Sequence, residues 1–372
     1  MARAIVGGEL RTTPKPGFVP SWACEADNAA LGRLLRETPM EGRIRIALER
    51  EPDFFRAAKL EGDRHYTATA REPATSELFA MCSRSVRERF VNGAVNRVGY
   101  LSQLRIHPAQ RGQTRSLMRA GFQWLMGTRL SDEAPFDITS IMDENLPARR
   151  LLTAGLLGLP VYVELEQIVT MLIRVQQRCG RTVPAVVRGT PAASPDIIGC
   201  LRRFNCRHQF APHWTVDNLF SADTPGVEDF FLFVDDGRVT GCVALWDQRA
   251  HKQTVVRGYT GILARSRWLL NLVGAGLPSA GSVVPMAWLS HLAVDEDRPE
   301  VFEALVRSVL AYLSPRSDLQ WLAFGVTARH PLAGVARRFA AHTHASRLYA
   351  VHEPGSSPDL DGRIPHVEVA LL

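Results

Sequence analysis

The segment from Tyr100 to Met126 restricts more than any other what this chain can fold into. Apolar and polar residues alternate at its start, which predicts a β-strand over residues 98–106. Pro108 ends that strand, because proline has no N–H to donate to a neighbouring strand. Thr114 is placed to cap a helix, and the residues after it are apolar at helical spacing. The segment therefore predicts a strand, a short loop and a helix in direct succession.

The loop inside this segment predicts an anion-binding site. It reads Gln110-Arg111-Gly112-Gln113, and Arg115 follows in the first turn of the helix. The N–H groups of a first helical turn are unpaired and the helix dipole favours negative charge there, so the two arginines add to an existing preference. The alternative is an ordinary surface turn in which the arginines stand by chance.

Length and composition describe a soluble protein of two domains. The chain has 372 residues, of which 46% are hydrophobic and 22% charged, and no apolar run reaches membrane-spanning length. The first residues lack the apolar core of a secretory signal. The cysteines show no CxxC pair and no metal-ligand spacing, which is typical of reduced thiols in a cytoplasmic protein without a metal site. They are Cys24, Cys82, Cys179, Cys200, Cys206 and Cys242.

The charge pattern gives no sign of a nucleic-acid or membrane partner. The formal net charge is +6, nearly all basic residues are arginines, and no stripe combines basic with aromatic residues. We therefore expect neither nucleic acid nor a membrane among the partners, and we leave open whether the chain forms a homo-oligomer.

Helices and a meander of strands are predicted before residue 176. A helix with Leu31, Leu34 and Leu35 on one face follows a short edge strand. Asn92-Gly93 is a tight-turn signal between two strands of the meander. The expected strands cover residues 18–22, 65–71, 76–89, 98–106 and 136–142, and two more are expected within 161–175. A further helix is expected at 148–154.

The run from Ile106 to Ser116 resembles the acyl-CoA-binding motif of the GNAT acyltransferase superfamily. In that motif an Arg or Gln is followed by two residues, a Gly, one residue, and a Gly or Ala. Aligned on Arg111, the two small positions fall on Thr114 and Ser116, which depart from the pattern. The order of the elements expected over residues 18–176 also resembles this family.

The resemblance implies that an acyl-CoA binds here as co-substrate. The residues implied for its phosphates are Arg111, Gly112, Gln113, Thr114, Arg115 and Ser116. The backbone N–H groups implied for its thioester are those of Leu104, Arg105 and Ile106. The segment Asn145-Leu-Pro-Ala148 resembles a second motif of the family, in which the Asn side chain meets the pantetheine arm. The alternative for Asn145 is a simple helix N-cap.

The second half is predicted to repeat this plan without the cofactor loop. Asp235-Asp-Gly237 between apolar runs predicts a hairpin, and the strand at 286–294 corresponds in order to that at 98–106. Strands at 347–351 and 367–371 are expected to close a second sheet, and a helix is expected at 331–340. At the place of the basic loop this half reads Asp295-Glu-Asp-Arg-Pro-Glu300, and its acids would repel a pyrophosphate.

These observations predict an α+β fold of two tandem GNAT-like domains. We expect the first to cover residues 1–176 and the second 177–372. Each would have a mixed, largely antiparallel sheet flanked by helices. Only the first would bind acyl-CoA, and the second would shape the acceptor side of the cleft.

Several residues are alternatives for the general acid and the general base of such a transfer. Family members often carry a Tyr four residues after the Ala of the second motif, where this chain has Leu152. Tyr162, Tyr100 and Ser102 are substitutes for the proton donor. Glu88, Asp143 and Glu144 are the alternatives for a base. Paired GNAT-like domains also occur in N-myristoyltransferases, whose terminal carboxylate acts as base, and this likeness implies a similar role for the carboxylate of Leu372.

The resulting expectation is an acyl-CoA-dependent N-acyltransferase, with acetyl-CoA or another acyl-CoA as co-substrate. Its acceptor would be a small-molecule or peptide amine. No Ser-His-Asp or Cys-His arrangement and no G-x-S-x-G elbow stands out, which favours direct attack over a covalent intermediate. The alternative is a non-catalytic GNAT-like protein that binds acyl-CoA or interacts with a partner.

Overall fold

The computed structural model describes residues 17–175, 183–272, 276–314 and 318–372. Before the first internal gap, the strands are β1 (Val19–Trp22), β2 (Ile44–Glu49), β3 (Arg64–Arg71), β4 (Leu78–Val91), β5 (Ala94–Ile106), β6 (Glu133–Met142) and β7 (Val161–Arg174). The helices of this part are α1 (Asn28–Glu37), α2 (Phe54–Lys59), α3 (Thr114–Met126) and α4 (Leu146–Leu152). A 3-10 turn, η2 (Pro108–Gln113), precedes α3.

The later part of the chain contributes a second set of elements. Its strands are β8 (Val186–Arg188), β9 (Phe230–Asp235), β10 (Arg238–Trp246), β11 (Gln253–Tyr259), β12 (Met286–Val294), β13 (Trp321–Thr327) and β14 (Ala340–His352). Its helices are α5 (Ser194–Asn205), α6 (Val216–Leu219), α7 (Gly261–Leu272), α8 (Pro299–Leu313) and α9 (Ala333–Arg337). Two 3-10 turns matter below, η5 (Asp295–Asp297) and η6 (Val369–Leu371).

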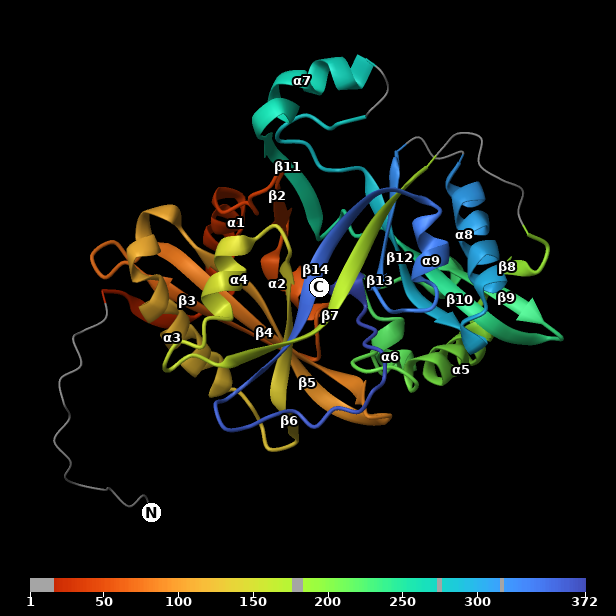
Figure 1. The fold of residues 1–372 in the computed structure, drawn as a ribbon, viewed down its shortest axis with the longest axis horizontal. Coiled ribbons are helices and arrows are strands. Elements are labelled where there is room, and N and C mark those ends of the chain that lie inside the picture. Colours follow the sequence, from red (N-terminus) through yellow and green to blue (C-terminus); the bar gives the residue numbers. More distant parts are fainter. Residues whose placement is uncertain (1–16, 176–182, 273–275, 315–317) are drawn as a thin grey trace.

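One continuous sheet runs through the centre of the molecule (Figure 1). Its strand order is β1-β3-β4-β5-β6-β14-β7-β13-β12-β10-β9-β8, and β11 pairs with β2 in a separate ribbon. Neighbouring strands of the large sheet are antiparallel except for two parallel pairs, β5 with β6 and β12 with β13. The predicted class, a mixed and largely antiparallel sheet flanked by helices, is confirmed.

The first part of the sheet has two faces that carry different chemistry. Side chains of β4 alternate between them, as the period of a strand requires. Cys82 and Arg84 lie on the face covered by α3, which we call the α3 face. Met81 lies on the opposite face, where it packs with buried leucines of α1 and with Phe54 of α2. We call this the α1 face, and Ser83 and Ser85 share it with Met81 because they follow at period two.

The last strands of the two halves are exchanged. The strand expected at 347–351 is β14, and it was expected in a second sheet. It lies instead between β6 and β7, both from the first half, in antiparallel register with each. In turn β7 pairs with β13 of the second half. The expectation of two separately closed sheets is therefore wrong, because each terminal strand hydrogen-bonds along both of its edges to strands of the other half.

Three smaller expectations also need correction. The segment 161–175, expected as two strands, is one strand with a bulge opposite the step from Leu348 to Tyr349. The helix expected at 331–340 is only Ala333–Arg337, because β14 already starts at Ala340. The segment 367–371 ends in the 3-10 turn η6 and is not a strand.

Turn signals in the sequence are placed where they were predicted. Asn92 and Gly93 join β4 to β5 with φ of 52° and 81°, and Asp236 and Gly237 join β9 to β10 with φ of 48° and 75°. These left-handed values match the twist of a tight hairpin, which explains the Asn-Gly and Asp-Gly pairs. Both hairpin predictions are confirmed.

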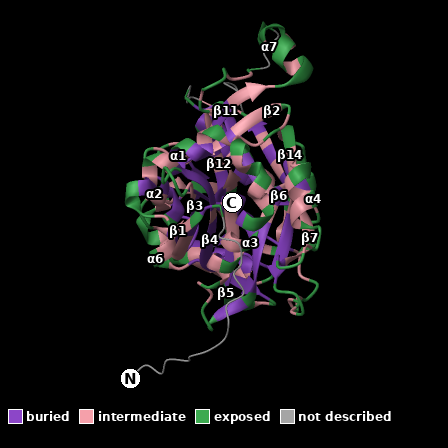
Figure 2. Cartoon of the chain, turned by 90° about the vertical axis from the view of Figure 1, so that its left-hand side faces the viewer, coloured by how far each residue is buried: buried purple, intermediate pink, exposed green. Residues whose placement is uncertain are grey.

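The core lies on both faces of the sheet, beneath the helices. The strands are largely buried, whereas the outer sides of the helices are exposed (Figure 2). The largest buried cluster joins the inner faces of α5 and α8 to β10, β12 and β13. Within the described residues, no helix is both long and apolar enough to cross a membrane.

Candidate active site

The parallel strands β5 and β6 separate toward their C-terminal ends. The two strands are in register at Gly99 with Asp137 and at Tyr100 with Ile138, and no later pair is formed although both strands continue. Just past this point the Thr139 hydroxyl donates to the Leu101 carbonyl over 2.8 Å. The end of β5 from Ser102 to Ile106 therefore lacks a strand neighbour on the β6 side.

A bulge interrupts β5 where it leaves β6. Met81 of β4 pairs with Arg105 and Ser83 pairs with Ser102, so Gln103 and Leu104 have no partner in register. Gln103 has a φ of 53°, a left-handed value that turns its backbone out of the ladder. The N–H groups at such a bulge are left without a ladder acceptor, on the strand that borders the gap.

The basic loop directly follows this bulged strand. η2 and the start of α3 carry Arg111 and Arg115, both exposed and without an ion pair to any residue that the structure describes. Gly112 is open, since a Cβ added there would meet no atom within 4 Å. Thr114 does not cap the helix as expected. Its hydroxyl donates to the Arg111 carbonyl over 2.6 Å, because the turn before α3 is itself helical.

The remaining loop residues lie at the same helix start. Ser116 is exposed in the first turn of α3, and Gln113 donates from its side chain to the Gln110 side chain over 2.9 Å. Asn145 lies at the start of α4, where its side-chain oxygen accepts from the Ala148 N–H over 3.3 Å. The N-cap alternative for Asn145 is thus realised, and its contact with a pantetheine arm stays a prediction.

The second half contains a parallel pair that parts in the same way. β12 and β13 are in register only from Met286 with Trp321 to Trp288 with Ala323. His291 of β12 has a φ of 53°, the same value as Gln103, and follows a comparable register shift. β5 and β12 therefore carry equivalent bulges, each on the strand that leads to the α3-like helix of its half.

The two bulges differ in what occupies them. In the second half the segment from Pro365 to Leu371 lies against both strands where they part. The N–H of His291 donates to the Glu368 carboxylate over 2.7 Å, and the Thr327 hydroxyl donates to the Pro365 carbonyl over 2.7 Å. A Cβ at Gly325 would come within 2.6 Å of Val369, which shows how closely the segment packs. The second half thus fills its own bulge with an internal carboxylate.

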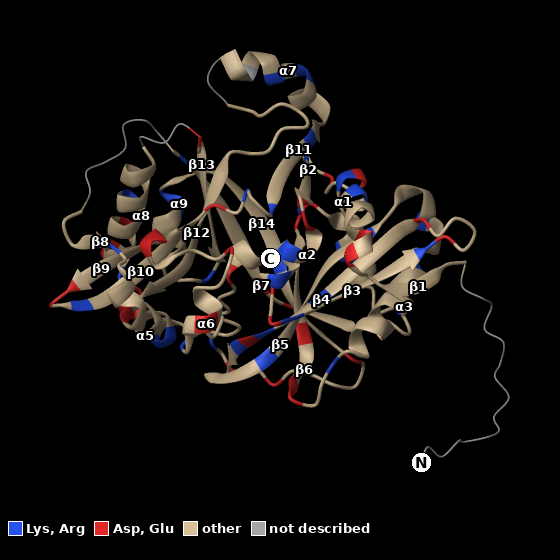
Figure 3. Ribbon diagram, turned by 180° about the vertical axis from the view of Figure 1, so that it is seen from behind, with Lys and Arg blue, Asp and Glu red and all other residues tan. Residues whose placement is uncertain are grey.

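The acidic loop of the second half is neutralised by protein contacts. Asp295 in η5 accepts from Arg203 of α5 over 2.9 Å, and Asp297 accepts from Arg207 over 3.1 Å. Basic and acidic residues both lie around α5 along the ribbon (Figure 3). Arg238 adds a third cation at 3.5 Å from Asp295. The loop is therefore built as an ion-pair network, in contrast to the arginines of the first-half loop.

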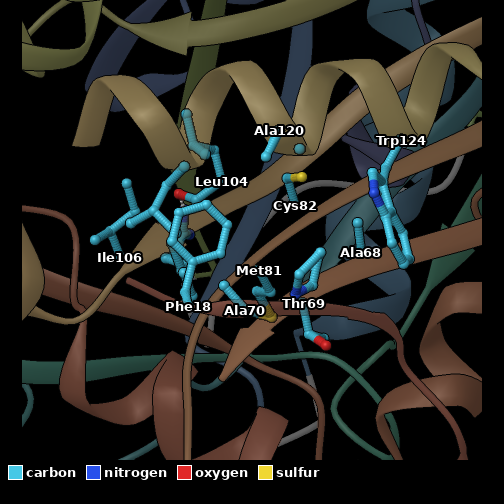
Figure 4. Close-up of a pocket in the computed structure, with 15 residues that line it drawn as sticks. Phe18, Ala68, Thr69, Ala70, Met81, Cys82, Leu104, Ile106, Ala120 and Trp124 are labelled. Atoms are coloured by element: carbon cyan, nitrogen blue, oxygen red, sulfur yellow. Dashed lines mark hydrogen bonds between the residues drawn. The ribbon is translucent and has the colours of Figure 1, made fainter. Parts of the chain in front are cut away.

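A small apolar pocket lies beneath α3, next to the basic loop (Figure 4). Phe18, Leu104, Ala120 and Trp124 line it, and Cys82 forms part of its floor. Its free volume is 30 Å³, room for about two water molecules. A long alkyl chain would therefore not fit without rearrangement of α3.

Tyr162 and Tyr100 lie on opposite faces of the sheet. Tyr162 belongs to a cluster with residues of α3 and α4, including Leu152, and its ring meets Tyr349 edge-on with centroids 6.2 Å apart. Burial raises its pKa, so the hydroxyl stays protonated. Tyr100 lies on the α1 face and hydrogen-bonds Ser140 of β6 over 2.8 Å, and burial raises its pKa to about 12.

The carboxylates considered as bases are mostly engaged elsewhere. Glu88 accepts from His213 over 2.9 Å, and Asp143 accepts from Arg347 over 2.8 Å. Glu144 is exposed. The Leu372 carbonyl oxygen accepts from Lys252 Nζ over 2.8 Å, and burial lowers the pKa of that lysine to about 8. The catalytic roles of Tyr162 and of the Leu372 carboxylate stay predictions.

Sequence reasoning missed Gln103 and a buried polar group on the α1 face. Alternation in β5 gives no sign of a bulge, because the left-handed turn at Gln103 follows from pairing with β4. The polar group contains Arg50 directly after β2, Glu61 just after α2, and His65 in β3. Arg50 and Glu61 stand on either side of α2, and nothing in the sequence shows that they meet.

One group of potential metal ligands is explained by contacts within the protein. Among the described residues, ligand atoms of His208, Asp297 and His330 lie within 4.8 Å of one another. The Leu332 N–H donates to His330 Nδ1 over 3.1 Å, so the other ring nitrogen carries the proton and is not a lone-pair donor. Asp297 is held by Arg207. These contacts favour a structural role at the junction of η5 with α5.

Comparison with known proteins gives structural matches alone. No protein-family model matches the chain, and no curated protein matches its sequence. The N-myristoyltransferase of Saccharomyces cerevisiae with bound myristoyl-CoA matches with a TM-score of 0.60 and 11% identity, covering 99% of this chain and 96% of its own. The chain has the GNAT fold. A GCN5-related N-acetyltransferase from Sphaerobacter thermophilus matches with a TM-score of 0.56 and 14% identity, over 94% of this chain and 100% of its own.

These matches confirm the predicted GNAT architecture over the whole chain, because both cover nearly all of it. Both halves contain a parallel strand pair that separates and a bulge on its first strand, at Gln103 in β5 and at His291 in β12. At such identities a shared fold does not define a shared substrate.

Proposed function

We propose that this chain is an acyl-CoA-dependent N-acyltransferase whose first half binds the co-substrate. The observation that carries the proposal is the contrast between the two bulges. An internal carboxylate fills the bulge of β12, whereas the bulge of β5 is followed by a basic, open loop at a helix start. A backbone donor that binds a carboxylate oxygen in one half is suited to a thioester oxygen in the other.

The loop fits the phosphates of a CoA. Arg111 and Arg115 supply unpaired cations, Gly112 leaves the backbone open, and the first turn of α3 presents N–H groups. The second half lacks these features, since arginines already pair with the aspartates of its loop and its bulge is filled. We therefore propose one CoA per chain.

Transfer by direct attack suits this arrangement. The neutral amine attacks the thioester carbon, the carbonyl oxygen gains charge at the N–H groups of the β5 bulge, and the C–S bond breaks while the nitrogen releases its surplus proton to water. Tyr162, protonated and on the α3 face beside the end of β5, is the proposed proton donor to the leaving thiolate. The volume of the pocket beneath α3 supports a short acyl group such as acetyl.

Binding and turnover of acetyl-CoA test this function. Calorimetry should show one site per chain, and release of free thiol should require an added amine from a panel of amino acids, polyamines and short peptides. Binding of acetyl-CoA without thiol release on any amine would favour the non-catalytic alternative. The apolar Leu152, at the position where family members often carry a Tyr, also favours that alternative. Absence of binding would contradict both functions.

The thiol of Cys82 should not be acylated. Burial raises the pKa of Cys82 to about 12, so almost no thiolate, the nucleophilic form, exists at neutral pH. Intact-mass spectrometry after incubation with acetyl-CoA, without acceptor, is expected to show the unmodified mass. Cys24 is exposed, so a Cys24→Ser variant controls for chemical labelling. A stoichiometric adduct on Cys82 that disappears on adding amine would establish a covalent intermediate instead.

A further inference from the structure

The α1 face of β5 carries buried donors that the protein leaves without acceptors. The polar groups around them are paired in a chain of hydrogen bonds. Ser85 donates to Glu61 over 3.3 Å, His65 Nδ1 bonds Ser85 over 2.8 Å, and His65 Nε2 bonds Thr67 over 2.9 Å. Thr67 in turn bonds Ser83 over 2.8 Å. Because these side chains satisfy one another through hydrogen bonds, the unpaired donors on this face lie outside the network.

Two of these unpaired donors belong to arginines. Nη1 of Arg50 and Nε of Arg105 are buried and have no hydrogen-bond partner among the described residues. Arg50 is 2% exposed. Its other terminal nitrogen pairs with Glu61, and its guanidinium lies over the Phe54 ring, 4.7 Å from the centroid. Arg105 donates only to the carbonyl of its neighbour Leu104, over 3.0 Å.

The two guanidinium groups lie near each other on the same face. Arg105 pairs in register with Met81, and Met81 packs with Phe54, over which Arg50 lies. Burial lowers the pKa of Arg105 to about 10, and the nearby charge of Arg50 adds to the lowering. Within the described residues, Glu61 is the acid in contact with this pair, and of the two guanidinium groups it pairs only with that of Arg50. The charge of Arg105, whose Nε is buried although the residue is only partly buried, is thus left without an acid in contact among the described residues.

The unpaired charge of Arg105 lies next to the bulge of β5, where the thioester is proposed to react. Arg105 directly follows the bulge of Gln103 and Leu104, and Ser102 before the bulge has a buried hydroxyl oxygen without a partner. The phosphate loop leads into α3, which covers the opposite face. A second substrate that does not cross the CoA path must therefore reach the bulge from the α1 face.

We propose that the acceptor is an amine that carries a carboxylate, and that Arg105 with Arg50 binds this carboxylate. The inference rests on the proposed acyl transfer and narrows its substrate class to amino acids and related amino acid-like amines. Two adjacent guanidinium donors match the two oxygens of a carboxylate, and binding would compensate the uncovered charge. The same chemistry would suit a carboxylate on the acyl group, so the test separates the two sources.

The test compares matched acceptors and matched co-substrates. Thiol release from acetyl-CoA is measured with the common amino acids and with their amides, which keep the amine but lack the charge. Amino acids should be acylated and their amides should react at least about tenfold less efficiently. Equal rates for acids and amides would overturn the inference while leaving the acyltransferase intact. Preference for succinyl-CoA over acetyl-CoA, regardless of the acceptor's charge, would assign the carboxylate to the acyl group and overturn the acceptor claim.

Variants of Arg105 test whether its side chain binds the carboxylate of the acceptor. Arg105→Gln should raise KM for the carboxylate acceptor at least about tenfold with kcat and CoA affinity little changed, and Arg105→Lys should restore part of it. Arg97→Gln on the same strand is the control, because Arg97 lies about half exposed and pairs with Asp132. Arg50 is a poorer choice, since its removal would leave the buried Glu61 without the arginine that pairs with its charge.

A binding measurement keeps the inference testable without turnover. In the presence of CoA, amino acids should raise the melting temperature of the wild type more than their amides do, and this difference should vanish in Arg105→Gln. A wild type that responds equally to both, or a difference that persists in Arg105→Gln, contradicts the proposed subsite. If CoA itself fails to bind, the proposed function fails first, and the two failures are distinguished.

Discussion

Replacing Arg111 and Arg115 together by alanine should weaken acetyl-CoA binding by about 2 kcal/mol or more, which is roughly a thirtyfold rise in Kd. Both side chains are exposed, lie at the helix start of α3 and lack an ion pair among the described residues. Their charge is therefore free to meet phosphates, and charge-assisted contacts are the strong ones. Calorimetry at low ionic strength measures the change.

Arg202→Ala with Arg337→Ala is the matched control for this double substitution. Both residues are exposed arginines on helices of the second half, so the net charge of the protein falls by the same amount. The control should bind acetyl-CoA as the wild type does. Equal affinity in all three proteins would place the cofactor away from the basic loop.

A fragment of residues 1–176 should not fold by itself. In the intact chain β14 separates β6 from β7, and its residues Leu348 and Ala350 are fully buried. Without β14 the fragment would expose an unpaired strand edge and the apolar groups beneath it, which is a state prone to aggregation. Circular dichroism in urea should show no cooperative unfolding transition for the fragment.

The same fragment mixed with residues 177–372 provides the control. Co-expression should restore a soluble complex with a cooperative transition, since the break falls between β7 and β8 and β14 is again supplied. A fragment 1–176 that unfolds cooperatively alone would show that the halves are independent domains, as the sequence predicted. The boundary residues themselves, 176–182, lie outside the described residues, so the division at 176 stays a prediction.

The basic loop and the hairpins could be predicted because their signals are local. Pro108 stops β5, the glycines at 93 and 237 permit left-handed turns, and apolar spacing marks α1 and α3. The contrast between the basic and acidic loops was also readable, because it depends on which charges follow each strand. The structure added that the acids of η5 are paired by arginines of α5.

The site itself needed more than local signals. Arg111 and Asn145 were predicted from their neighbours in sequence, whereas the bulge at Gln103 depends on how β5 pairs with β4. The α1-face donors were missed for a similar reason. Arg50 and Arg105 are 55 positions apart, and they come together because α2 packs against Met81 of β4, which pairs with Arg105.

The sequence by itself determined the local elements and the charges that each loop carries, because propensity, turn chemistry and periodicity act over a few residues. The tertiary structure alone decided which strands become neighbours. β14 lies between β6 and β7, and residues 365–371 fill the gap between β12 and β13, because these positions bury both faces of apolar strands and satisfy their backbone donors. This arrangement fills the bulge of β12 with the Glu368 carboxylate, whereas the bulge of β5 is the one proposed to receive a substrate.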